Sequence, residues 1–318
     1  MYSIRTDLAI EAREIYKKEN NKEIPGVEVD VQKEENITVT RVKIVDERGE
    51  KIIGKPIGTY ITIESPELIH FDEDTEEKTS RLFSEELSYL INPDSNKTIL
   101  VVGLGNWNVT PDALGPKVVS KLMITRHLKE LMPEQVEEGV STVCALSPGV
   151  LGITGIETGE IILGVASQIK PDVIIAIDAL ASRKMERVST TIQLSNTGIS
   201  PGSGVGNKRM GLNEKLLGVP VIAVGVPTVV DAATMANDTI DLVIDKMINE
   251  AKVGKEFYNM LKNIDRQEKM QLISEVLSPY IEDLMVTPKE VDSIIDSISE
   301  IIAHGIDWAL HPSVANIQ

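Results

Sequence analysis

Three short, continuously apolar runs constrain the fold of this chain more than any other feature. They cover residues 98–102, 173–177 and 219–224, and each leads into a glycine or polar turn and then a stretch with helical spacing. Strands buried on both faces have this pattern, and their alternation with helices is typical of parallel strands joined by crossover helices. We therefore predict an α/β fold: an open, mostly parallel twisted sheet with helices on both faces.

The flanking segments predict additions to this core, which spans about residues 98–248. Alternating apolar residues from position 36 and at residues 60–64 indicate an N-terminal antiparallel β addition with one face in water. C-terminal helices complete the fold, the last one with Thr287 as its N-cap. Helices outside the core are expected near residues 11–19 (solvent-exposed), 78–91, 266–282 and 288–309.

Composition narrows the range of functions. A net charge of −17 repels nucleic acid and anionic membranes, so we expect direct binding to neither. Cys144 is the single cysteine, so no disulfide can form within the chain, which favours a reducing compartment. The N-terminus lacks an apolar signal core, and no apolar run reaches the roughly 18 residues needed to span a bilayer. A cytoplasmic location is therefore expected.

The turn after the first apolar run holds the first candidate carboxylate. Gly103 and Gly105 begin like a dinucleotide-binding loop, but position 108 is Asn, and no phosphate-loop lysine follows. Thr110 fits an N-cap and Asp112 fits the first turn of a helix, where the helix dipole stabilises a carboxylate. Asp112 is therefore either a helix-terminal charge or a reactive group.

The second candidate, Asp178, follows the second apolar run and is expected at the end of a buried strand. A charge there needs a partner or a function, because unpaired burial is costly. The residues leave two explanations open: an ion pair with Arg183 or Arg187, or catalysis. The third run leads to Thr228 and Asp231, for which a structural role as N-cap and capping partner is favoured.

Two glycine-rich loops are candidate ligand-binding elements, and the sequence motifs of other hydrolase classes are missing. Residues 147–158 and 200–209 are rich in glycine, and such loops let a backbone approach a ligand closely. No histidine follows a core strand, no HExxH or paired-cysteine spacing is present, and no serine lies in a GxSxG motif. By elimination, the reactive groups are carboxylates.

Six segments, in order along the chain, resemble the bacterial spore germination protease family. The likeness runs from about residue 2 to 311, and its clearest segments are residues 103–116, 147–158, 177–183, 201–209, 225–231 and 285–292. It implies an endopeptidase that initiates degradation of small acid-soluble spore proteins at germination. The family is made as a zymogen and forms homotetramers, and its activity implies a place in the spore core. Its two key aspartates match Asp112 and Asp178.

The resemblance also implies a processing site. Residues 3–11 are similar to the family's processing region, with cleavage between Asp7 and Leu8. Residues 1–7 are then a propeptide, and residues 8–318 form a single peptidase domain. The glycine-rich loops are expected to bind substrate and to offer backbone N–H groups to the oxyanion, at Gly105, Asn106, Gly149, Gly202 and Gly204.

For the mechanism, we expect Asp112 and Asp178 to share a water, one carboxylate taking its proton and the other carrying a proton to the oxyanion or leaving amine. Two close carboxylates cannot both stay ionised, so one is kept protonated near neutral pH. A remote similarity to hydrogenase maturation endopeptidases suggests an alternative, in which both aspartates bind a divalent metal; without a matching histidine, no cofactor is the favoured expectation. A nucleotide-binding regulatory module is a further alternative, supported only by the incomplete glycine pattern.

Overall fold

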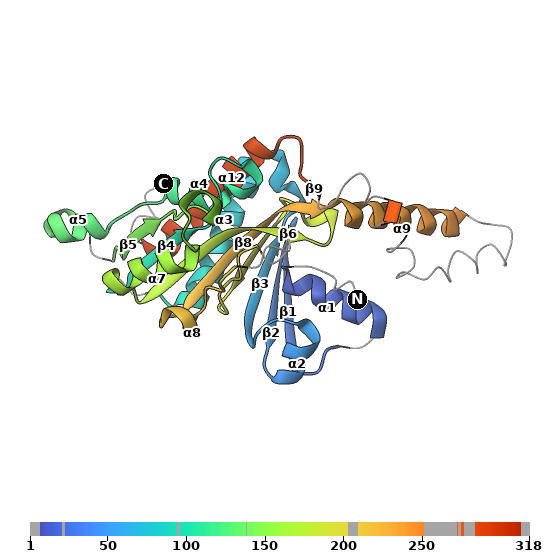
Figure 1. The fold of residues 1–318 in the computed structure, drawn as a ribbon, viewed down its shortest axis with the longest axis horizontal. Coiled ribbons are helices and arrows are strands. Elements are labelled where there is room, and N and C mark those ends of the chain that lie inside the picture. Colours follow the sequence, from blue (N-terminus) through green and yellow to red (C-terminus); the bar gives the residue numbers. More distant parts are fainter. Residues whose placement is uncertain are drawn as a thin grey trace.

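A computed structural model describes residues 7–20, 23–93, 96–137, 139–202, 209–250, 272, 275–276 and 284–312. Within these ranges a nine-stranded sheet runs through the molecule in the order β1-β2-β3-β7-β8-β6-β4-β5, with β9 (Met285–Val286) paired to β8 (Figure 1). None of the helices described in these ranges has the combination of length and apolar character needed to cross a bilayer.

The predicted parallel core is confirmed. Strand β6 pairs in parallel with both β4 and β8, and β4 pairs in parallel with β5. The core strands are β4 (Thr98–Gly103), β5 (Thr142–Leu146), β6 (Val173–Ser182) and β8 (Val221–Asp231). Because parallel strands point the same way, the segments that follow them gather at one edge of the sheet.

The predicted antiparallel addition is also confirmed, and it is continuous with the core. Strand β7 pairs antiparallel with β3 on one side and β8 on the other, so a single hydrogen-bonded sheet joins the two parts. The antiparallel strands are β1 (Val27–Glu34), β2 (Ile37–Ile44), β3 (Gly58–Glu64) and β7 (Thr191–Ser195). Strand β1 was not predicted from the sequence because half of its residues are charged. Strand β7 was not predicted because it is only five residues long.

Helices cover both faces of the sheet (Figure 1). One face packs against α3 (Glu73–Ile91), α4 (Leu114–Lys121) and α12 (Val291–Leu310). The opposite face carries α1 (Ala9–Asn20), α2 (Glu47–Ile53), α7 (Thr158–Ile169) and α8 (Glu214–Leu217). The shorter α5 (Arg126–Leu131) lies between α4 and β5, and α6 (Leu151–Thr154) follows β5. Helix α9 (Ala232–Glu250) projects from the end of β8.

The core is aliphatic, as the aromatic content of 3% requires. Along β4, Ile99 and Val101 point toward α4 and α12, whereas Leu100 and Val102 point toward α7. This alternation of two fully apolar faces explains why the strand reads as a continuous apolar run.

Several element boundaries differ from the predictions. The helix α12 begins at Val291, and the Thr287 hydroxyl donates to the Thr228 carbonyl (2.9 Å) instead of capping the helix. Strand β8 runs through Thr228, and Asp231 alone caps α9, accepting from the Thr234 N–H (2.9 Å). The helix predicted near 266–282 lies almost wholly outside the described residues.

Helix α1 is not the solvent-exposed helix that its charged sequence predicts. The Glu11 side chain in its first turn is buried, and so are Leu8, Ala9 and Ile10. The N-terminal end of α1 is therefore packed against the sheet.

The close approach of α4 to β4 yields a stability prediction. A Cβ at Gly115 would lie 2.4 Å from the Leu104 carbonyl oxygen and 2.5 Å from its nitrogen, backbone atoms that cannot move aside. We expect Gly115→Ala to lower the free energy of unfolding by about 1–3 kcal/mol. Gly164→Ala on α7, where a Cβ meets nothing within 4 Å, is the matched control and should raise it by about 0.5–1 kcal/mol. Urea denaturation measures both, and equal effects would contradict the steric explanation.

Candidate active site

The site forms where β4 ends beside β6. The chain leaving β4 stays bonded to β6, because the Leu104 N–H donates to the Ile177 carbonyl (2.8 Å), one residue before Asp178. Two residues further on, the Asn106 N–H donates to the Asp112 carboxylate (2.8 Å). This sequence of bonds brings the turn that holds Asp112 next to Asp178.

A tight glycine turn fixes Asp112. Gly105 has φ +113°, and a Cβ there would lie 2.0 Å from the Asp112 carbonyl oxygen, so only glycine fits. The Asn106 N–H donates both to the Asp112 carbonyl (3.0 Å) and to its side-chain Oδ2 (2.8 Å). Asp112 ends a short 3₁₀ turn, Thr110–Asp112, rather than opening an α-helix. Thr110 is not an N-cap, since its hydroxyl donates to Asp292 (2.8 Å).

Asp178 lies within β6, not at its end as predicted. Pairing with β8 continues through Ser182, and Asp178 stands opposite Gly225. Its side chain is only 5% exposed, and its Oδ1 accepts from the Ala179 N–H (3.0 Å). The strand continues because a buried carboxyl on one face leaves the backbone pairing intact.

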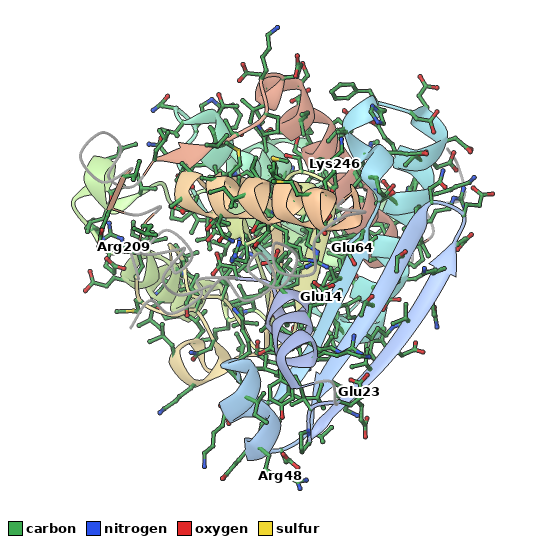
Figure 2. The ribbon with its side chains drawn as sticks, turned by 90° about the vertical axis from the view of Figure 1, so that its right-hand side faces the viewer. Glu14, Glu23, Arg48, Glu64, Arg209 and Lys246 are labelled. Atoms are coloured by element: carbon green, nitrogen blue, oxygen red, sulfur yellow. The ribbon has the colours of Figure 1, made fainter. Side chains whose placement is uncertain are left out.

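Of the two explanations left open for Asp178, the ion pair with Arg183 or Arg187 is wrong. Arg183 pairs with Asp238 (3.0 Å). Arg187 is bonded to Glu14 of α1 (2.7 Å) and to Glu64 at the end of β3 (2.8 Å), both labelled in Figure 2. Both guanidinium groups thus have other carboxylate partners.

The pKa values of both aspartates are shifted in the same direction. Burial raises the pKa of Asp178 well above its usual range, and the negative charges of Asp112 and Asp7 raise it further. Burial also raises the pKa of Asp112, against the opposing effect of the Asn106 N–H. Asp112 therefore lies close enough to Asp178 for its charge to raise the pKa of the buried carboxyl.

The Asp7–Leu8 segment lies against this same face of the sheet. The Asp7 N–H donates to the Ala181 carbonyl (3.5 Å), and the Ala181 N–H donates to the Asp7 carboxylate (3.2 Å). The Leu8 side chain is fully buried in a cluster with Ile10 and Leu180. The Asp7–Leu8 bond is thus docked on β6, close enough for the Asp7 charge to act on Asp178.

Charged groups around Asp7 hold the beginning of α1 in place. The Glu11 carboxylate accepts from the backbone N–H groups of Arg183 (2.8 Å) and Lys184 (3.0 Å). Burial lowers the pKa of the Lys55 ammonium, and the carboxylates of Asp7 and Glu11 oppose that shift. Lys55 therefore lies close enough to Asp7 and Glu11 for their charges to act on it.

The glycine loops occupy different positions around the site. Gly149 (φ +73°) follows β5 at the edge where the core strands end, and Gly202 (φ +70°) lies in the connection from β7 to α8. Gly204 is outside the described residues. The Asn106 N–H is bonded to Asp112, so here it orients a carboxylate.

The metal alternative depends on Asp112 and Asp178 as ligands. Throughout the described ranges, no three His, Cys, Asp or Glu side chains converge into a group that could hold a metal ion. Catalytic zinc sites, for comparison, have three protein ligands, and Asp112 and Asp178 supply two carboxylates.

Sequence reasoning missed three residues of this site. Lys55 stands in a polar turn after α2, and Glu11 in what reads as a solvent-exposed helix. Gln193 is a polar residue between Ile192 and Leu194 in the fully buried strand β7. Of the three, only Gln193 carried a recognisable signal, because a polar side chain between two core residues needs a partner.

Comparison with known proteins decides the family. The germination protease family profile matches residues 6–256 and 245–318. The chain belongs to the germination protease family. It is accordingly a protease, a hydrolase of peptide bonds connected with spore germination, which confirms the resemblance seen in the sequence.

Relatives match the chain over almost its whole length. Germination proteases of Clostridium perfringens and Clostridium tetani are 61% and 60% identical, covering 99% and 98% of this chain and 97% of their own. The germination protease of Bacillus mycoides is 45% identical over 98% of this chain and 95% of its own. A solved NiFe hydrogenase maturation protease from Thermococcus kodakarensis KOD1 is 15% identical, with a TM-score of 0.32 over 70% of this chain and 99% of its own, too low a score to support an inference.

The raised pKa of Asp178 predicts a pH-dependent stability. Between about pH 4, where an unfolded aspartate titrates, and the higher folded-state pKa, the folded protein binds more protons than the unfolded chain. Stability therefore falls as pH rises through this window. We expect Asp178→Asn to unfold at higher urea concentration than the parent protein at pH 8, with the difference shrinking toward pH 4. A variant less stable than the parent at pH 8 would contradict the unpaired burial of this carboxyl.

Proposed function

We propose that this germination protease is an endopeptidase that initiates the degradation of small acid-soluble spore proteins, using the Asp112–Asp178 pair to activate water. The observation that carries the proposal is the buried Asp178, whose pKa is raised by burial and then by the charge of Asp112. Perturbed, coupled carboxyls are characteristic of functional sites and of acid–base pairs in particular.

The two environments suggest which group does what. Asp178 is the more deeply buried and has the larger upward pKa shift, so it is the group that stays protonated near neutral pH. Asp112 accepts a hydrogen bond from the Asn106 N–H, which favours its charged form. Asp112 is therefore the base and Asp178 the acid.

In the proposed reaction, Asp112 takes a proton from water while the water oxygen bonds to the carbonyl carbon of the substrate. The C–N bond then breaks, and the proton of Asp178 goes to the leaving nitrogen. The products are a new carboxyl group and a new amine. Proton transfer back from Asp112 to Asp178, directly or through a water, restores the pair.

The same chemistry supports self-processing of a zymogen. The Asp7–Leu8 bond is the cleavage site implied by the family likeness, and Asp7 is bonded to Ala181, three residues beyond Asp178 in β6. An acidic residue followed by an apolar one also matches the expected substrate site. We propose that cleavage removes residues 1–7, and that the processed chain works as a homotetramer in the spore core without binding nucleic acid or membrane.

The first test replaces each carboxyl by its neutral amide. Asp112→Asn and Asp178→Asn should each lower the rate of cleavage of a small acid-soluble spore protein, and of self-processing, by about 10²–10⁴-fold, the usual contribution of general acid–base groups. Asp307→Asn is a matched control, because burial also raises the pKa of Asp307, to about 7, while it lies on α12 across the sheet. Full activity of either site variant would contradict catalysis by the Asp112–Asp178 pair.

A second test addresses the metal alternative. We propose catalysis without a metal, since the described donors offer no group of three ligands. Activity should be unchanged after dialysis against a chelator, and metal analysis of the active protein should find less than one ion per chain. Loss of activity on chelation, restored by one divalent cation, would replace the water-only pair with a metal-assisted mechanism.

A further inference from the structure

The side chain of Gln193 binds the backbone on both sides of the Asp7–Leu8 bond. Its Nε2 donates to the Asp7 carbonyl oxygen (3.2 Å), and its Oε1 accepts from the Ala9 N–H (2.8 Å). The Gln193 side chain is only 8% exposed, so these bonds are made away from bulk water. The oxygen bonded by Nε2 is the one that becomes an oxyanion if the Asp7–Leu8 bond is attacked.

The sheet register places Gln193 level with Asp178. Both residues stand opposite Gly225, Asp178 on the β6 side of β8 and Gln193 on the β7 side. Residues level with one another on adjacent strands face the same side of a sheet. The carboxyl and the amide therefore flank one glycine, on the face that carries residues 7–10.

Apolar packing fixes the register of the docked segment between these two side chains. Leu8 packs with Leu180, which is two residues after Asp178 on the same face of β6. A Cβ at Gly225 would lie 2.4 Å from Leu180, so glycine is needed for Leu180 to occupy this position. The Leu8 side chain, the Asp7 carboxylate and the Asp7 carbonyl each have a separate partner in the sheet.

We propose that Gln193 is a catalytic residue that donates a hydrogen bond to the oxygen of the cleaved carbonyl and aligns the amide two residues beyond. The inference rests on the proposed function. As the attacking water adds, negative charge develops on that oxygen, and a donor already in place in a water-poor site stabilises it more than it stabilises the ground state. Because both of these Gln193 side-chain hydrogen bonds are to backbone atoms, they are open to any segment docked in this register.

A purely structural role makes a different prediction. Ala9 is the first residue of α1, whose first N–H groups lack partners within the helix, and Gln193 Oε1 satisfies one of them. If Gln193 is only a cap for α1, glutamate can replace it, because a carboxylate accepts the same bond. If it is an oxyanion donor, glutamate fails, since it has no N–H to offer.

The test measures self-processing of the full chain, by mass spectrometry of the product that begins at Leu8. Gln193→Leu and Gln193→Glu should each slow processing by about 10²–10³-fold, as loss of one oxyanion donor does. Gln193→Leu should lower the processing rate without shifting its dependence on pH, because an amide does not titrate. Gln168→Leu, at an exposed position on α7, is the control and should process at the parental rate.

Each outcome decides between the roles. If both Gln193 variants process at the parental rate, the inference is overturned. If Gln193→Leu is slow and Gln193→Glu processes at the parental rate, Gln193 acts only as a cap of α1. If the leucine variant does not unfold cooperatively, the glutamate variant alone decides. A parent chain that does not cut between Asp7 and Leu8, or an Asp178→Asn variant that does, refutes the proposed function instead.

Discussion

The burial of one carboxyl group in the middle of a parallel strand is the constraint on which this structure depends. Asp178 occupies a position in β6 between the core residue Ile177 and the half-buried Ala179, and in the described part of the chain the nearby Arg183 and Arg187 pair with other carboxylates. Such a group is tolerated only in its neutral form or at a considerable cost in free energy. Three features surround this carboxyl. A glycine turn holds the second carboxyl, that of Asp112, and Gly225 on the next strand leaves room for Leu180. The Asp7 carboxylate is docked close by on β6.

Contacts from the segment between β6 and β7 hold the N-terminal helix. Arg187 is buried and bonded to Glu14 and Glu64, and the main-chain N–H groups of Arg183 and Lys184 hold Glu11. These contacts tie α1 to the segment between β6 and β7. The same loop therefore holds the docked chain in place, while burial and the charges of Asp112 and Asp7 keep the pKa of Asp178 high.

Much of the fold and both aspartates could be predicted from the sequence, because apolar runs and glycine turns are local patterns. The continuation of β6 past Asp178 could not be, since it depends on pairing with Gly225, 47 positions along the chain. Glu11 reads as solvent-exposed because its burial is caused by backbone N–H groups of a distant loop. The role of Gln193 likewise needs the register of three strands, which no window of sequence contains.

The position at which α1 begins has an electrostatic consequence. The helix starts at Ala9, so its positive dipole end faces the Asp7–Leu8 bond. Hydrolysis there would turn a neutral amide into an ammonium group at that end, an arrangement that costs a helix about 0.3–1 kcal/mol. Glu11, in the first turn, opposes this repulsion. The newly made terminus would thus lie between its own helix dipole and a buried acid, where salt screens charges less than at the surface.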